Sequence, residues 1–318
     1  MFSSAKQAIF KIQSAVAKEA ALEPPITPHV ELEQSLTIHA TNEVLLAAGT
    51  IGTPQLLQLS GIGDSDVLSG LGIESAVNLP DVGKNLQDHP MAVVYLQVNS
   101  TKGWDDVTRN NTVFNDYLQE WEASREGLFV NSPANTLAFM RLPSDASVFE
   151  QYSDPSPDEC SAHTELIFVV CTYDLLCIRP YDKPRIDPAF LTHDFDTYAM
   201  VQALNDINEL IASPEWSGYV TGSIGEITGT DTSTDATKLE FARENSYNVN
   251  HAVGTAYMSP ANSTVGVVNP DLTVKGTKKL RVVDASIFPV IPPNHPQAQV
   301  YMVAERAADL IKDAYDLN

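Results

Sequence analysis

The stretch EVLLAAGTIGTPQLLQLSGIG, from Glu43 to Gly63, contains the pattern that decides the fold class. It begins with a short, mostly apolar run, residues 43–47, of the kind expected for a strand buried on both faces. A glycine turn follows, and Thr53 and Pro54 suit the N-cap and the first position of a short helix. The order of strand, glycine turn and proline-started helix predicts an α/β fold.

The segments around this stretch extend the pattern. Residues 36–39 read as a second strand, and Asp64 or Ser65 can cap a further short helix. The chain returns to the same character near its end, where a strand and turn around residues 279–291 precede an amphipathic helix at residues 298–315. Residues 91–249 differ, because β-type runs alternate there with long amphipathic helices. We therefore predict α/β plus α+β: an α/β domain from residues 1–90 and 250–318, with an inserted antiparallel-sheet domain at residues 91–249.

Composition excludes several classes of function. The 318 residues carry a formal net charge of -22, and such a chain repels nucleic acid. No run of eighteen apolar residues is present, so no transmembrane helix is expected. The three cysteines, Cys160, Cys171 and Cys177, form no C-x-x-C pattern. We predict no metal site and read these cysteines as small buried hydrophobic residues. No G-x-S-x-G pattern occurs either, which argues against a serine hydrolase.

The N-terminal segment, residues 1–20, lacks the sustained apolar core of a signal peptide and reads as an amphipathic helix. Three N-x-[ST] sequons, at Asn99, Asn110 and Asn262, hint at secretion.

A histidine in the stretch NVNHAVGTAYMSP, His251, is the first candidate for chemistry. Considered alone, it is either a buried structural residue or a general base, because imidazole has an intrinsic pKa near neutrality. The other motifs of the chain have to decide between these two alternatives.

Five ordered motifs resemble those of the glucose-methanol-choline (GMC) flavoprotein oxidoreductases. GTIGTPQLLQLSGIG meets every constrained position of that family's second signature, and LPDVGKNLQDHP, HAVGTAYM, LRVVDASIFP and YMVAERAADLIK resemble later segments. The fungal aryl-alcohol oxidase branch is the most similar in its details. The resemblance covers residues 37–311, which correspond to the C-terminal half of a typical member. It implies an incomplete FAD-binding, Rossmann-like domain and an inserted substrate-binding domain.

The resemblance also implies roles for particular residues. His251 would be the catalytic base and His295 its supporting hydrogen-bond donor, while FAD takes up a hydride at its N5 atom. Asp284, Ala285, His295, Pro296 and Gln297 would contact the cofactor, and Asn250 would face the substrate. Asn85 and His89 read as groups that order a loop. The implied partners are a small alcohol, aryl or otherwise primary, and oxygen or another electron acceptor. The full-length relative is expected to be extracellular.

Three departures from the family pattern support an alternative. The G-x-G-x-x-G element that holds the ADP part of FAD does not occur, and GIGDSD at residues 61–66 cannot replace it, since an acid would stand at the third glycine position. Compared with the family's usual spacing, about thirty residues that normally help to line the active site are missing before residue 179. Asn250 and Ala252 replace an aromatic residue and a proline. The alternative is a non-catalytic, truncated or degenerate GMC relative that does not retain FAD.

Overall fold

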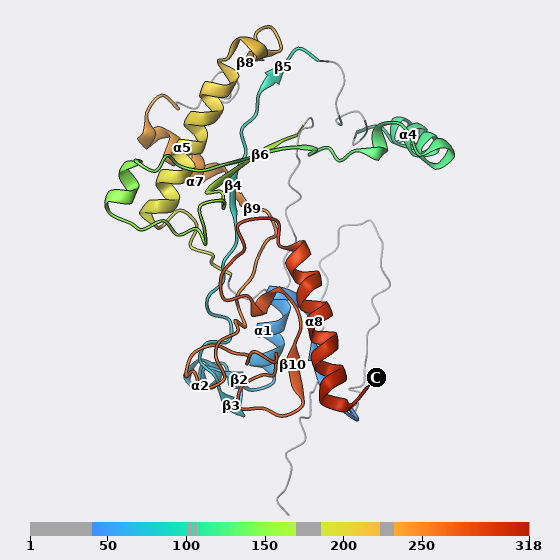
Figure 1. The fold of residues 1–318 in the computed structure, drawn as a ribbon, viewed down its shortest axis with the longest axis vertical. Coiled ribbons are helices and arrows are strands. Elements are labelled where there is room, and N and C mark those ends of the chain that lie inside the picture. The colour runs from blue at the N-terminus through green and yellow to red at the C-terminus, as the bar shows by residue number, and fades with distance from the viewer. Residues whose placement is uncertain are drawn as a thin grey trace, which may run out of the picture. The chain divides into compact units, whose positions relative to one another are not determined.

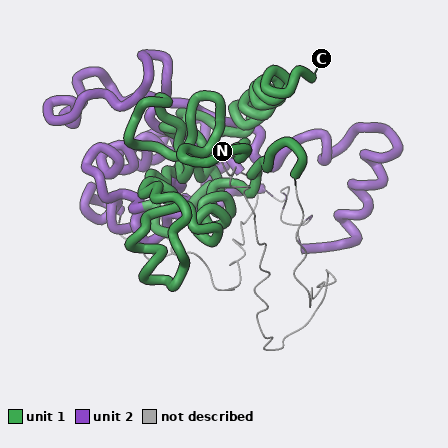
Figure 2. The backbone as a smooth tube through the Cα atoms, turned by 90° about the horizontal axis from the view of Figure 1, so that it is seen from below, with its two compact units in different colours: residues 1–89, 179–188, 248–318 green, residues 90–178, 189–247 purple. Residues whose placement is uncertain are grey.

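The structure is a computed structural model that describes residues 40–100, 104, 107, 109–169, 186–222 and 232–317. The chain divides into two compact units (Figure 2). Unit 1 consists of residues 1–89, 179–188 and 248–318, and unit 2 of residues 90–178 and 189–247. The predicted strand at residues 36–39, the predicted N-terminal helix, Cys171 and Cys177 lie outside the described residues.

Unit 1 contains two pairs of short parallel strands (Figure 1). β1 (Val44–Leu46) pairs with β10 (Leu280–Val282), and β2 (Ile62–Gly63) pairs with β3 (Val77–Asn78). The first pair joins the predicted early strand to the predicted late strand, as an α/β reading requires. β1 is not buried on both faces as predicted, because Leu45 is 47% exposed.

The helix of the opening stretch starts earlier than predicted. α1 runs from Gly49 to Leu59, so Thr53 is not the N-cap and Pro54 lies inside the helix. The reason is a carboxylate supplied from elsewhere in the chain. Asp284 accepts a hydrogen bond from the first helical amide, Gly49 N, at 3.0 Å, and another from the Thr53 hydroxyl at 2.6 Å. A helix whose first donor is satisfied in this way needs no cap from its own sequence.

Pro54 is tolerated inside α1 because another residue replaces the hydrogen bond that proline cannot make. Proline has no backbone N–H, so the carbonyl of Thr50, four residues earlier, loses its helical donor. The Thr255 hydroxyl donates to this carbonyl at 2.5 Å. Thr255 belongs to the HAVGTAYM motif, so this bond joins α1 to the segment that carries His251.

The remaining helices of unit 1 follow the sequence pattern. α2 (Ser65–Gly70) is capped by Asp64, whose carboxylate accepts from the amides of Asp66 and Val67. The 3-10 helix η4 (Ala285–Ile287) follows β10, and α8 (Gln297–Tyr315) ends the described chain.

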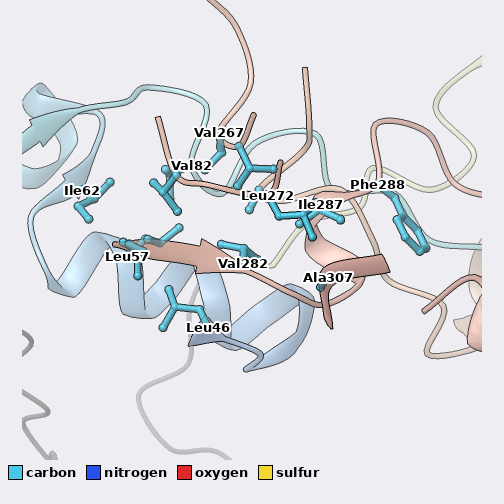
Figure 3. Packing of buried hydrophobic residues seen from close by; sticks show 14 of the residues in the cluster. Leu46, Leu57, Ile62, Val82, Val267, Leu272, Val282, Ile287, Phe288 and Ala307 are labelled. Atoms are coloured by element: carbon cyan, nitrogen blue, oxygen red, sulfur yellow. The ribbon is translucent and has the colours of Figure 1, made fainter. Parts of the chain in front are cut away.

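Among the described residues, an apolar core joins β1, α1, β10 and α8 (Figure 3). Leu46 of β1, Leu57 of α1, Val282 of β10 and Ala307 of α8 all belong to it. A buried ion pair lies beside this core: the Nε atom of Arg281 is 2.9 Å from Oε2 of Glu43, and the two side chains are 7% and 6% exposed. This ion pair joins the segments of β1 and β10, which are also joined by strand pairing.

Unit 2 combines antiparallel strand pairs with long helices, as the sequence pattern of the middle block predicts. β5 (Gln97–Val98) pairs antiparallel with β8 (Val220–Gly222), and β6 (Thr136–Met140) with β7 (Thr164–Phe168). β4 (Pro90–Ala92) pairs with β9 (Ser246–Asn248). The α-helices described are α4 (Asn111–Ser124), α5 (Asp194–Ile211) and α7 (Asp235–Asn245), and the 3-10 helices are η1 (Leu128–Val130), η2 (Ser147–Glu150) and η3 (Pro214–Trp216). Two smaller cores pack around α5.

Candidate active site

Three segments of unit 1 carry the candidate histidines. The segment before His89 pairs antiparallel with the segment after His251, through a bridge between Gln87 and Val253. Their backbones exchange two hydrogen bonds, of 3.1 and 2.8 Å. The Thr50 hydroxyl of α1 donates to the Ala252 carbonyl at 2.6 Å. The segment of His251 is therefore attached directly to α1, and the segment of His89 is attached to it through this bridge.

The third segment is the loop that leads to His295 and α8. Gln87 holds it through both ends of its amide, since Nε2 donates to the Pro289 carbonyl and Oε1 accepts from Ile291 N at 3.1 Å. Asn85 donates to the same Pro289 carbonyl at 3.1 Å. Asn85 thus orders a loop, as the sequence predicts.

The rings of three histidines meet at this place. Nδ1 of His89 lies 3.0 Å from Nδ1 of His251, and the two rings are nearly perpendicular, at 86°. The ring centroids of His251 and His295 are 5.0 Å apart. The structure therefore brings the predicted pair together. It also adds His89, which the sequence reading treated only as a residue that orders a loop.

The position of His89 could have been found from the register of the pairing. Because Gln87 faces Val253 in antiparallel strands, His89 faces His251 two residues further on. The sequence shows no strand at this place, since neither segment alternates between apolar and polar residues. Short bridges of this kind give no periodic signal.

The site favours the neutral forms of His251 and His89. Burial, followed by repulsion from His89 and His295, lowers the pKa of His251 to about 4. Burial and His295 also lower the pKa of His89. One nitrogen of the close pair must carry the proton that the other accepts, because two cationic rings at this distance repel each other. A neutral imidazole is the form that can accept a proton from a substrate.

One acid lies next to the pair. The Asp88 carboxylate accepts hydrogen bonds from the backbone amides of His89, at 2.8 Å, and His251, at 3.0 Å. Burial raises the pKa of Asp88, and the two amide hydrogen bonds oppose that effect.

The predicted cofactor residue Asp284 is engaged inside the protein. Its side chain accepts from Gly49 N, the Thr53 hydroxyl and Ser286 N, and the residue is only 7% exposed. The Ala285 carbonyl accepts from Gly254 N at 3.3 Å. The carboxylate of Asp284 therefore joins α1 to the turn after β10.

The other predicted residues lie at the surface or at the start of α8. His295 and Gln297 are exposed, and Pro296 is buried as the N-cap residue of α8, which has no side-chain cap. Asn250 is exposed and has a positive φ of 60°, a conformation that asparagine tolerates better than most residues. It turns the chain immediately before His251.

A pocket elsewhere does not coincide with these residues. It has a volume of about 540 Å³ and belongs to unit 2, where it is lined by Phe190, Leu191, Thr192, Arg243 and Ser246. It contains none of the predicted catalytic side chains, so the histidine cluster is the better candidate for chemistry. Within the described ranges, no cluster of His, Cys, Asp or Glu is arranged to bind a metal ion, and no helix is long and apolar enough to cross a membrane.

The fold and the ordered motifs define a class of redox enzymes that use a flavin. Two sequence models of the GMC oxidoreductases, an N-terminal and a C-terminal one, match residues 27–91 and 174–304. The chain belongs to the GMC oxidoreductase family.

Two relatives illustrate its place in the family. The dehydrogenase eriK of Hericium erinaceus is 36% identical, over 90% of this chain and 53% of the relative. The pyranose dehydrogenase of Agaricus campestris is 31% identical, over 87% of this chain and 51% of the relative. The chain thus spans about half the length of the curated relatives it matches.

Solved structures give the same fold. A formate oxidase variant from Aspergillus oryzae, studied for FAD modification, has a TM-score of 0.76 and 28% identity, and covers 89% of this chain and 56% of its own. A fungal aryl-alcohol oxidase has a TM-score of 0.66 but only 21% identity, so it shows the fold alone. The expected similarity to the aryl-alcohol oxidase branch is therefore not confirmed. The relatives include fungal dehydrogenases instead.

FAD is the cofactor that family membership implies, and the residues at the start of α8 fit it. This helix begins directly after His295 and Pro296 without a side-chain cap, so no side chain satisfies its first amides or its positive dipole end. Such an end suits the negative charge that a flavin ring would carry once reduced. The Asp284 side chain, with its internal donors, offers no comparable contact.

Proposed function

We propose that this chain is the C-terminal portion of an FAD-dependent oxidoreductase that acts on the CH–OH group of a small alcohol, with His251 as the base. The observation that carries the proposal is the cluster of His251, His89 and His295, in which burial and neighbouring rings keep the pKa of His251 low. His251 is therefore neutral near neutral pH and able to accept the hydroxyl proton of an alcohol.

The roles of the surrounding residues follow from their contacts. Nδ1 of His251 faces His89, which leaves Nε2 as the nitrogen that receives the substrate proton. His295 donates a hydrogen bond to the alcohol oxygen, which steadies the negative charge that develops there. When bound, FAD accepts the hydride that leaves the alcohol carbon. Asp284 and Ala285 would contribute backbone groups to the cofactor site, and Pro296 and Gln297 would approach the flavin ring through their backbones. Asn250 faces the substrate.

The relatives suggest which alcohols to test. One is named a pyranose dehydrogenase, so sugars are one candidate class. Aromatic primary alcohols, which the sequence motifs imply, are the other. Unit 2 is proposed as the substrate-binding domain, and unit 1 as part of the FAD-binding domain. An extracellular location, as expected for full-length relatives, completes the proposal.

The first experiment measures FAD binding by the purified chain, through quenching of flavin fluorescence. Oxidation of benzyl alcohol and of D-glucose is then followed with oxygen or benzoquinone as acceptor. His251→Ala is expected to bind FAD as the unaltered chain does and to lose about 10²- to 10⁴-fold in turnover, the usual contribution of a general base.

His193→Asn is the matched control, because His193 caps α5 in unit 2 and asparagine caps a helix as well. It should change neither FAD binding nor turnover. A chain that binds no FAD at saturating concentration would contradict the proposal and support the non-catalytic alternative. Equal turnover in His251→Ala and the unaltered chain would exclude His251 as the base.

A further inference from the structure

The backbone pairing around the histidines contains an irregularity. Gln87 and Val253 form a hydrogen-bonded pair of antiparallel strands, in which each amide donates to the opposite carbonyl. In a regular ladder the next hydrogen-bonded pair would be His89 and His251, two residues further along. Their amides do not donate across the pair. Both donate instead to Oδ1 of Asp88.

One carboxylate oxygen therefore replaces two ladder hydrogen bonds. In a regular pair the two donors point to different carbonyls, whereas here both converge on a single atom. The rings of the same two residues lie with their Nδ1 atoms 3.0 Å apart. Asn250, with its positive φ, ends the regular backbone on one side, so the pairing alone does not hold His251 in place.

We propose that Asp88 is a positioning residue, whose carboxylate oxygen holds the backbone amides of His89 and His251 together and thereby fixes the contact between their rings. The inference rests on the proposed role of His251 as the base. In this role Asp88 acts as a hydrogen-bond acceptor for the two backbone amides.

Two substitutions distinguish the role of Asp88 as a hydrogen-bond acceptor from an effect of its negative charge. Asp88→Asn keeps an amide oxygen that can accept from both backbone amides and removes the negative charge. Asp88→Ala removes the acceptor as well. If the carboxylate works by position, asparagine rescues the site and alanine does not. If it works by charge, the two variants behave alike.

The readout is the protonation of His251 in the chain without added FAD. Long-range ¹H–¹⁵N spectra of ¹⁵N-histidine-labelled protein at about pH 5.5 distinguish neutral from protonated rings. His251 and His89 signals are assigned with His→Asn variants. The groups that face His251 are His89, His295 and Asp88. With a pKa of about 4, His251 is mostly neutral at this pH in the unaltered chain.

The expected result is that Asp88→Ala makes His251 mostly protonated, because the rings separate and both the burial of His251 and its repulsion from His89 decrease, while Asp88→Asn leaves it neutral. Asp81→Ala is the matched control. Asp81 also accepts a backbone amide in unit 1, Gly266 N, and its hydrogen bonds within the described part of the chain reach Gly266 and Tyr257 rather than a histidine. A neutral His251 in Asp88→Ala, equal changes in both Asp88 variants, or an equal change in Asp81→Ala overturns the inference.

Two measurements on the unaltered chain and its variants decide the remaining outcomes. If Asp88→Ala does not fold, hydrogen exchange of the unaltered chain decides, because the amides of His89 and His251 must exchange slowly if both are hydrogen-bonded; fast exchange of either contradicts the inference. If the chain binds no FAD and yet the Asp88 variants behave as expected, the proposed function fails while the positioning role stands.

Discussion

Replacing Asp284 with alanine removes the acceptor that starts α1. In the folded protein this carboxylate accepts from Gly49 N at 3.0 Å, the Thr53 hydroxyl at 2.6 Å and Ser286 N at 2.8 Å. The Thr53 and Ser286 donors are buried, and each costs about 2 kcal/mol when left without a partner. Gly49 N is partly buried and contributes less. The expected loss is therefore about 4 kcal/mol in the free energy of unfolding.

Urea unfolding followed by far-UV circular dichroism measures this loss. All three tryptophans, Trp104, Trp121 and Trp216, belong to unit 2, so tryptophan fluorescence reports separately on that unit. Hydrogen exchange over residues 44–60 then localises the effect, because the first amides of α1 lose their acceptor.

Asp284→Asn and a double-mutant cycle complete the design. Asparagine keeps one oxygen and should cost about half as much. Thr53→Val keeps the shape of Thr53 without its hydroxyl, and the cycle with Asp284→Ala should give a coupling energy of about 1 kcal/mol. A loss below about 1 kcal/mol for Asp284→Ala, or no coupling, would refute the reasoning that this carboxylate is the external acceptor of α1.

Glu43→Ala leaves the guanidinium of Arg281 buried without its partner, and should lower the free energy of unfolding by about 3 kcal/mol in urea titrations; a neutral result would show that the pair is not buried in solution. His251 has a folded pKa of about 4 against an ordinary 6.5, so the unfolded chain binds its proton more readily. The urea midpoint should therefore fall as the pH is lowered from about 6.5 to about 4, and His251→Asn should flatten this dependence. Gly254→Ala places a Cβ against the Asn85 carbonyl at a φ of 94°, and should destabilise unit 1 by more than about 1 kcal/mol in thermal melts, whereas Gly70→Ala, which meets open space, should not.

The sequence predicted those features that depend on local pattern. The strand at β1, the Asp64 cap of α2 and the long helices α4, α5 and α8 all follow from periodicity and capping residues. The order of the motifs indicated the family. The family resemblance also paired His251 with His295, whose rings lie close together in the structure.

The features that the sequence did not predict depend on partners distant in the chain. The start of α1 was placed at Thr53 because the sequence near it contains a cap, whereas Asp284 supplies the acceptor from far along the chain. The contact of His89 with His251 depends on a short bridge whose register has no periodic signature. The Asp88 hydrogen bonds depend on the same register.

The Thr255 hydroxyl donates a hydrogen bond to the Thr50 carbonyl, which Pro54 cannot reach with an N–H. This bond restricts which residues can occur together at positions 54 and 255 in the family. A chain that replaces Pro54 with any residue bearing an N–H regains the helix's own donor, and its residue 255 no longer needs a hydroxyl. Where Pro54 is kept, a residue without a hydroxyl at 255 leaves a buried carbonyl unpaired. Relatives that keep proline at position 54 should therefore keep threonine or serine at position 255, whereas relatives without this proline should vary there.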